Sequence, residues 1–196
     1  PRAAAFILLP LSDEGLPKDS AEKHGIIREI LRRAEAIGMG KEDIVVDGLV
    51  ATIGANPKAA LESFETFSFC KNEMELPTVC GLSNISFGLP ERSYVNTAFL
   101  TMAIGNGLTM AIANPSQELL MSCALAADLL LNKEEAALRY IEYAGGVRER
   151  REEKEAELAK KLALLENQGT TAKTGTAGNA AKEETCLLYT SPSPRD

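Results

Sequence analysis

The segment from Gly81 to Arg92 holds polar side chains suited to recognising a small molecule. Within it, Asn84 offers both a hydrogen-bond donor and an acceptor, and Ser83 and Ser86 add hydroxyl groups. Arg92 contributes a permanent positive charge on a planar fork of donors. The segment contains no obvious nucleophile. We therefore predict a recognition site at this point of the chain.

A carboxylate follows a second apolar run. Asp47 comes directly after Ile44, Val45 and Val46, whose β-branched side chains favour a buried strand. We expect this strand to cover residues 43–47, which places Asp47 at its carboxyl end. Carboxylates in this position of parallel folds either bind ligands or cap loops, and the residue types alone leave the two roles equally open.

Both segments belong to a repeated pattern of strand, loop and helix. Apolar runs predict strands over residues 4–9, 43–47, 76–82 and 108–113. Helices are predicted from residue 21, after Asn56-Pro57, across residues 95–103 and after Asn114-Pro115. Units of this kind predict parallel strands joined by right-handed crossovers. Apolar residues at these spacings are expected in the core, among them Met102, Met110 and Met121.

The predicted fold class is α/β. An eight-unit barrel takes about 250 residues and carries its sites in the loops after its strands, so four units fit one half of a (β/α)8 barrel. An open doubly wound sheet is the alternative. The chain has neither a GxGxxG motif after its first strand nor a GxxxxGK[ST] motif, which argues against those phosphate cradles. Because Pro1 almost directly precedes an apolar run, we expect a fragment that begins inside a fold.

The composition changes after residue 145. Residues 1–145 are predicted to form the half-barrel, and the charge-dense residues 146–168 a solvated connecting helix. Residues 169–184 are rich in Gly, Ala, Thr and Lys and are predicted to form a flexible, disordered linker. Residues 185–196 resemble a translated sequencing-adapter read-through, so we leave them out of the fold.

Composition and charge exclude several classes of protein. A net charge of -7 and an isoelectric point near 5.0 argue against a nucleic-acid surface. No apolar run approaches the roughly 18 to 20 residues that span a bilayer, and no signal peptide is recognisable, so we expect a cytoplasmic protein. The single histidine, His24, and four dispersed cysteines predict no metal site and no disulfide framework. We expect buried, reduced thiols and a surface position for His24.

The chain from about Ala3 to Tyr143 resembles the pterin-binding domain of cobalamin-dependent methionine synthases. The resemblance rests mainly on the long and specific Gly81–Arg92 motif, which reads GLSNISFGLPER. Three shorter segments support it and are weak alone: Asp47–Leu49, Ala111–Pro115 and Leu129–Lys133. The match covers only the last four strands of the barrel of that family.

The resemblance implies a function in methyl transfer. The family binds methyltetrahydrofolate as a substrate and passes its methyl group to cobalamin, from which homocysteine is methylated to methionine. Asp47 matches the carboxylate that hydrogen-bonds the pterin, and Asn84 matches the catalytic amide near the N-5 nitrogen. Arg92 matches the basic residue after the motif, and Gly81, Ser83 and Ser86 complete the expected pterin-binding set. Cobalamin-binding and homocysteine-binding domains of a parent protein would be the partners, and the isolated chain is expected to be inactive.

Alternatives remain open for both the residues and the function. Asn84 could stabilise its own loop, and Arg92 could be a surface residue near a helix start, where a cation is disfavoured without an acidic partner or a ligand. Asn114 is expected to be a helix cap. The nearest rival function is transfer of the same methyl group to a corrinoid iron-sulfur protein. Dihydropteroate synthase shares the fold, but its basic motif is not found, and a non-catalytic fragment that only docks partners is the remaining alternative.

Overall fold

The computed structural model describes residues 5–168. The chain divides into two compact units, Pro1–Arg151 and Glu152–Asp196. The linker predicted over residues 169–184 and the tail predicted over residues 185–196 lie outside the described residues. The site residues predicted from the sequence all lie in the first unit.

One sheet organises the first unit. Its strands are β1 (Phe6–Leu8), β2 (Ile44–Asp47), β3 (Thr78–Gly81) and β4 (Met110–Ile112), hydrogen-bonded in the order β1-β2-β3-β4. All three strand pairs are parallel. The α/β prediction is confirmed, and the sequential order fits half of a (β/α)8 barrel. The doubly wound alternative is disfavoured, because its strand order reverses at a switch point.

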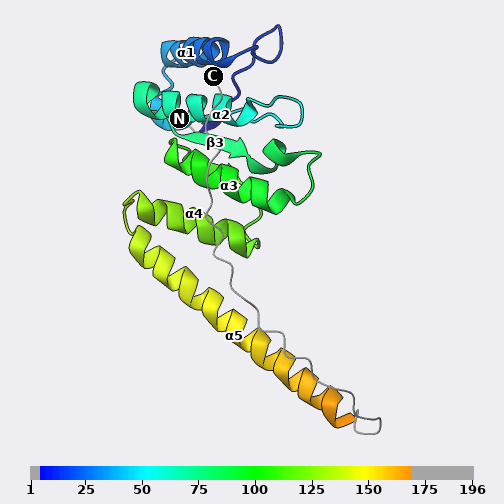
Figure 1. The fold of residues 1–196 in the computed structure, drawn as a ribbon. Coiled ribbons are helices and arrows are strands. Elements are labelled where there is room, and N and C mark those ends of the chain that lie inside the picture. The colour runs from blue at the N-terminus through cyan, green and yellow to red at the C-terminus, as the bar shows by residue number, and fades with distance from the viewer. Residues whose placement is uncertain (1–4, 169–196) are drawn as a thin grey trace, which may run out of the picture. The chain divides into compact units, whose positions relative to one another are not determined.

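Helices alternate with the strands. They are α1 (Ser20–Ala36), α2 (Ala59–Phe69), α3 (Arg92–Gly105), α4 (Glu118–Leu130) and α5 (Ala136–Gln168). Helices α1 to α4 pack in chain order, each against the next (Figure 1). Short 3-10 turns cover Lys41–Asp43 and Leu82–Ser86, and a π turn covers Cys70–Met74.

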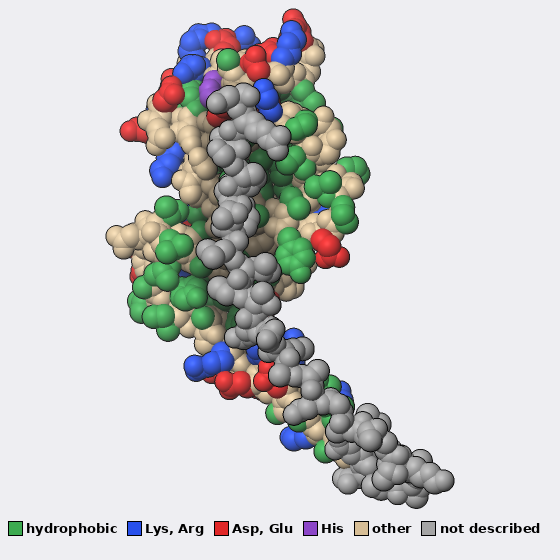
Figure 2. All heavy atoms as spheres, viewed as in Figure 1, with side chains coloured by type: hydrophobic (Ala, Val, Ile, Leu, Met, Phe, Trp, Pro, Cys, Tyr) green, Lys and Arg blue, Asp and Glu red, His purple; other side chains and the backbone are tan. Residues whose placement is uncertain are grey.

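Helix α1 shows why its sequence folds in this way. The Asp19 side chain caps the helix by accepting a hydrogen bond from the Glu22 amide at 2.8 Å, and Glu22 accepts one from the Lys18 amide at 2.7 Å. Charged side chains gather over α1, at the top of the view in Figure 2. The opposite face of the helix is buried and carries Lys23, Ile27, Leu31 and Ala34.

The helices cover one face of the sheet. On that face Leu8, Ile44 and Val46 are buried in one cluster with Ile27 and Leu31. A second cluster packs Cys80 with the helix residues Phe67 and Ala103. Because side chains alternate along a strand, their sequence neighbours point to the other face, which we call the uncovered face. Val79 on β3 also points to this face but is buried.

The uncovered face corrects two predictions. Apolar residues of the run over residues 4–9 were expected in the core, but Ile7 and Leu9 are exposed. Met110 was expected in the core and is 43% exposed, and all three residues of β4 are exposed, on both faces of that strand. Met102 on α3 is also outside the core, at 54% exposed, while Met121 is half-buried.

Helix α5 begins earlier than the charged helix predicted over residues 146–168. It starts at Ala136 and continues through Gly145 and Gly146, where the composition changes. Its side chains from residue 152 to residue 164 are exposed, as a solvated helix requires. The proposed domain boundaries stay a prediction. Within the described residues, no helix combines the length and apolarity needed to span a membrane.

Candidate functional site

Two predicted site residues end neighbouring strands. Asp47 is the last residue of β2 and pairs with Val79, and Gly81 is the last residue of β3 and pairs with Ile112. Val46 is buried against the helices, so the next side chain, Asp47, points to the uncovered face, where it is half-buried. The strands are parallel, so their carboxyl ends meet at one edge of the sheet. Asp47 and Gly81 therefore share that edge.

A tight turn fixes Asp47. Its Oδ1 atom accepts a hydrogen bond from the Leu49 amide at 2.8 Å, and the Gly48 amide donates to the Val79 carbonyl at 2.9 Å. Leu49 has a left-handed backbone, with φ 46°, which costs a non-glycine residue about 1–2 kcal/mol. Gly48 is required here because a Cβ would lie 2.4 Å from the Phe67 ring. Packing and hydrogen bonds thus hold a strained turn beside the carboxylate.

Lys23 is a buried cation that the sequence analysis missed. Its side chain is 7% exposed, and Nζ donates a hydrogen bond to the Gly48 carbonyl at 3.1 Å. Burial lowers the pKa of Lys23, while the nearby carboxylates of Glu62 and Asp47 act in the opposite direction. A signal for this residue was present, because Lys23 continues the buried stripe of Ile27, Leu31 and Ala34 by one helical turn.

Asn84 lies on the 3-10 turn that follows β3. Leu82 and Ile85 anchor this turn in the core, and Asn84 is exposed between them. Its side chain folds back over the end of the strand, since a Cβ on Gly81 would lie 3.2 Å from the Asn84 Nδ2 atom. The lack of a side chain at Gly81 therefore leaves room for the Asn84 amide at the same edge of the sheet as Asp47.

Ser86 and Arg92 stabilise the loop that follows β3 by hydrogen bonds to other residues of the loop and of α3. Ser86 is fully buried, its Oγ donates to Asn96 Oδ1 at 2.7 Å, and it accepts from Arg92 Nε at 3.0 Å. Arg92 Nη2 also donates to the Ser83 carbonyl at 2.6 Å. These contacts explain a cation in the first turn of α3. The pterin contacts expected of Ser83, Ser86 and Arg92 stay a prediction, and in this structure the polar atoms of Ser86 serve the loop.

Hydrogen bonds join the loops after β2 and β3. Thr52 Oγ1 donates to the Phe87 carbonyl at 2.8 Å, and the Ile53 amide donates to the Ile85 carbonyl at 3.0 Å. The loop that begins after Asp47 is therefore fixed to the turn that carries Asn84. The two side chains that the sequence singled out are held by one connected framework.

The thiols near this framework are not activated. Burial, with a smaller effect of the Asp47 charge, raises the pKa of Cys80 to about 12. Burial also raises the pKa of Cys70 to about 12. Both cysteines are free and buried, as predicted, while Cys123 is half-buried and Cys186 lies outside the described residues. Neither Cys70 nor Cys80 forms a thiolate near neutral pH, so neither is a ready nucleophile.

His24 is half-buried, although a surface position was predicted. Its ring stacks on Phe69 with centroids 4.0 Å apart, and Arg28 lies over the same Phe69 ring. Burial, followed by the charge of Arg28, lowers the pKa of His24. Among the described residues, no group of three or more His, Cys, Asp or Glu side chains is arranged to hold a metal ion.

Asn114 was expected to cap α4, but Gln117 occupies the N-cap position of that helix; Asn56 likewise precedes Lys58, the N-cap residue of α2. Asn56 Oδ1 accepts from the Lys58 amide, and Asn114 Oδ1 accepts from the Ser116 amide, both at 2.9 Å. Each side chain closes a turn that leads into the next helix. A cavity of about 360 Å³ between β4 and α4 is lined mainly by apolar residues, together with Thr109, Asp128 and Lys133, and includes none of the predicted site residues.

Comparisons with known proteins agree with this geometry. Residues 18–114 match the family model described as "Pterin binding enzyme". The methylcorrinoid:tetrahydrofolate methyltransferase of Eubacterium limosum is 28% identical over 150 residues, which cover 68% of this chain and 55% of that protein. The methionine synthase of Mycobacterium tuberculosis is 29% identical over 127 residues, which cover 61% of this chain and 11% of that protein.

The matched family segment begins just before α1 and ends just after β4, so it contains Lys23, Asp47, Gly81 and Asn84. The chain spans about half the length of the first of these relatives and about a tenth of the second. Four parallel strands with interleaved helices are what half of a barrel of this kind requires. Residues 18–114 therefore match a pterin-binding enzyme domain, and the chain is a distant homologue of both curated proteins.

Proposed function

We propose that this chain forms part of a pterin site that binds methyltetrahydrofolate and supports methyl transfer between the folate and a corrinoid. The observation that carries the proposal is the placement of Asp47 and of the Asn84 turn at the carboxyl ends of neighbouring strands, within the family match. Sites of barrel enzymes lie at this end of the strands. The polar groups face the side of the sheet that corresponds to the inside of a barrel.

Asp47 would hold the amino-pyrimidine edge of the pterin. Its Oδ1 already accepts a hydrogen bond from the Leu49 amide, which fixes the orientation of the carboxylate. Oδ1 keeps a second acceptor position, so Oδ1 and Oδ2 together can accept from the ring N–H and amino donors of the ligand. A carboxylate that accepts two parallel N–H bonds recognises that edge with a defined geometry.

Asn84 would act at the N-5 nitrogen. The methyl group leaves N-5 only when that nitrogen carries a positive charge, and the electrons of the broken C–N bond then stay on the nitrogen. An amide oxygen accepts a hydrogen bond from protonated N-5 without competing as a strong acid. A contact that strengthens as the proton arrives favours the transition state over the ground state. The corrinoid, bound to its own protein or domain, supplies the cobalt that exchanges the methyl group.

Two arrangements of the corrinoid partner are supported to different degrees. The longer match, to a methylcorrinoid:tetrahydrofolate methyltransferase, favours a corrinoid carried by a separate protein. The match to a methionine synthase favours a cobalamin-binding domain in the same polypeptide, with homocysteine as the final acceptor. We favour the first arrangement because the match covers more of both proteins.

The direct test is titration of the whole chain with methyltetrahydrofolate, followed by amide chemical shifts, which also detect weak binding. We expect shifts in the loops after β2 and β3, and their loss in Asp47→Ala. The matched control is Asp43→Ala, because Asp43 lies at the opposite end of the same strand. The proposal fails if no shifts appear, or if Asp47→Ala binds as well as Asp43→Ala does. A fragment that only docks partners gives the first of these two failures.

A kinetic test addresses Asn84. In the enzyme that contains this chain, Asn84→Ala is expected to slow methyl exchange with the corrinoid more than it weakens folate binding, because its contact is strongest in the transition state. Asn72→Ala is the control, since Asn72 is an exposed amide on the π turn. Equal rates for both variants would remove Asn84 from the mechanism.

A further inference from the structure

Lys23 and Asp47, the proposed pterin carboxylate, are hydrogen-bonded to the same peptide group, between Gly48 and Leu49. The Gly48 carbonyl, which accepts from Lys23 Nζ at 3.1 Å, and the Leu49 amide, which donates to Asp47 Oδ1 at 2.8 Å, belong to one peptide group. The ammonium is thus bonded to one end of this peptide and the carboxylate to the other. Hydrogen bonds arranged in a chain polarise and strengthen each other.

The peptide needs such a clamp. Leu49 has a left-handed backbone, which a leucine does not adopt without support, and Gly48 lies against the buried Phe67 ring. Rotation of the Gly48–Leu49 peptide would remove the donor from Asp47 and release the carboxylate from its orientation. Lys23, on α1, is the side chain that ties this peptide to the helix layer.

The surroundings of Lys23 are acidic. Its charge interacts with Glu62 and Glu65 on α2, with Asp47 on β2 and with the Cys70 thiol, and His24 follows it on α1. Glu62 itself accepts a hydrogen bond from Asn56 Nδ2 at 2.9 Å. Burying an ammonium is costly, and these carboxylates offset only part of that cost, since the pKa of Lys23 is still lowered by burial. An apolar residue would fit the buried stripe at lower cost, so the lysine points to a role beyond packing.

We propose that Lys23 is a positioning residue for pterin binding, which clamps the Gly48–Leu49 peptide and thereby aims the Asp47 carboxylate at the ligand. This inference rests on the proposed function, because it assigns the Asp47 contact to the pterin. Lys23 itself does not touch the ligand. It acts through one peptide group, and its removal changes the orientation of the carboxylate without deleting it.

The binding test compares Lys23→Met with Lys18→Met, in which an exposed lysine five residues earlier is replaced. We expect Lys23→Met to weaken methyltetrahydrofolate binding by about tenfold or more, the effect of losing one hydrogen bond from a charged group. Lys18→Met should bind like the unmodified chain. Equal affinity of the Lys23 and Lys18 variants would overturn the inference while leaving the proposed function in place.

A pH series separates positioning from packing. As the pH rises through the lowered pKa of Lys23, the ammonium loses its charge, so affinity should fall in the unmodified chain. Ionisation of the ligand affects the unmodified chain and Lys23→Met equally. We expect the fall in affinity that is due to Lys23 to be absent in Lys23→Met. The free energy of unfolding should rise over the same pH range. In this range the unfolded chain binds more protons than the folded chain, and loss of the proton removes the buried charge of Lys23. A parallel loss of binding and stability would show a structural role only.

A measurement without ligand keeps the inference testable if Lys23→Met does not fold. In the unmodified chain the amide shift of Leu49 should titrate together with the Lys23 side chain, because both groups bond to the same peptide. The amide of Ile53, in the same loop but bonded to the Ile85 carbonyl, is the internal control. A Leu49 amide that does not respond to the Lys23 titration contradicts the clamp. A chain that shows this response but no folate binding contradicts the proposed function instead.

Discussion

The two faces of the sheet differ in what their side chains do. On the covered face Ile44 is 0% exposed and packs with α1 residues in a continuous core. On the uncovered face Ile7, one strand away, is 51% exposed, and Asp47 is half-buried at the strand end. The same strands thus have one face that packs in the core and one face that carries the proposed site. The type of a residue alone does not predict its contribution to stability or to the site, because that contribution depends on the face of the sheet to which its side chain points.

The largest expected difference comes from one substitution made on both faces. Ile44→Ala should cost about 2–5 kcal/mol of unfolding free energy, because it leaves a cavity in a closed core. Ile7→Ala should cost less than about 1 kcal/mol, because half of that side chain is already in water. Chemical denaturation of both variants measures the difference. Equal losses would mean that the uncovered face is buried in solution.

A smaller difference is expected from two glycines at the site. Gly48→Ala should destabilise the fold by about 1–3 kcal/mol, because the added Cβ would lie 2.4 Å from the buried Phe67 ring. Gly81→Ala should change stability by less than about 0.5 kcal/mol, since its Cβ meets only the movable tip of Asn84 at 3.2 Å. It should still weaken folate-dependent methyl transfer by displacing the amide. Denaturation and methyl-exchange assays together separate the two effects, and unchanged transfer in Gly81→Ala would contradict the placement of Asn84.

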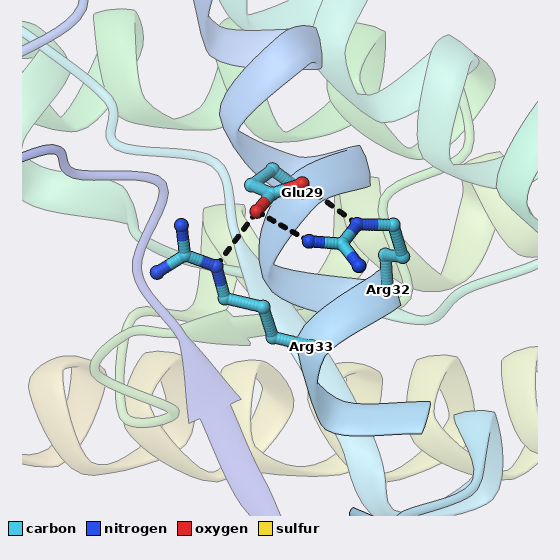
Figure 3. A network of polar contacts seen from close by, with 3 residues as sticks. All are labelled: Glu29, Arg32 and Arg33. Carbon is cyan, nitrogen blue, oxygen red and sulfur yellow. Dashed lines mark hydrogen bonds and ion pairs between the residues drawn. The ribbon is translucent and has the colours of Figure 1, made fainter. Parts of the chain in front are cut away.

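The smallest effect is expected on the outer surface of α1, where Glu29 accepts hydrogen bonds from Arg32 and Arg33 (Figure 3). Bonds to these guanidinium groups lower the pKa of Glu29 to about 2, from 4.5. Its contribution to stability is therefore present above pH 4.5 and is lost as the pH falls toward 2. Because the three side chains are exposed, solvent screens the interaction, and Glu29→Gln should shift the melting temperature only slightly. A large, salt-independent shift would contradict this ranking.

The sequence predicts the parts of the fold that depend on local pattern. Strand and helix order, the loops after each strand, and the positions of Asp47 and Asn84 at strand ends follow from periodicity and turn residues. Strands β1, β3 and β4 are shorter than the apolar runs that predicted them, because the residues at the ends of those runs lie in loops. The helix predicted to start at residue 146 in fact starts at Ala136 and runs through Gly145 and Gly146, since each glycine costs a helix only about 1 kcal/mol and the residues that follow are strong helix formers.

The remaining features depend on tertiary contacts. Hydrophobic periodicity places Met110 on a strand, but it does not report that the described residues of β4 are exposed on both faces. The bonds of Arg92 to Ser86 and to the Ser83 carbonyl require the three-dimensional path of the loop. The burial of Lys23 was not predicted, because a lysine on a helix ordinarily lies in water. Its place in the buried stripe was visible in the sequence, but its partner on another element was not.

The hydrogen bonds between the two site loops also affect their motion. Thr52 and Ile53 donate to carbonyls of the loop that carries Asn84, so neither loop opens fully without breaking bonds to the other. We expect the two loops to fluctuate as one cooperative unit, with similar amide exchange rates at Ile53 and in the Asn84 turn. A ligand that bridges both loops would then slow exchange in the pair together. The entropy of ordering the loops is in large part lost before the ligand arrives, which leaves more of its interaction energy for affinity.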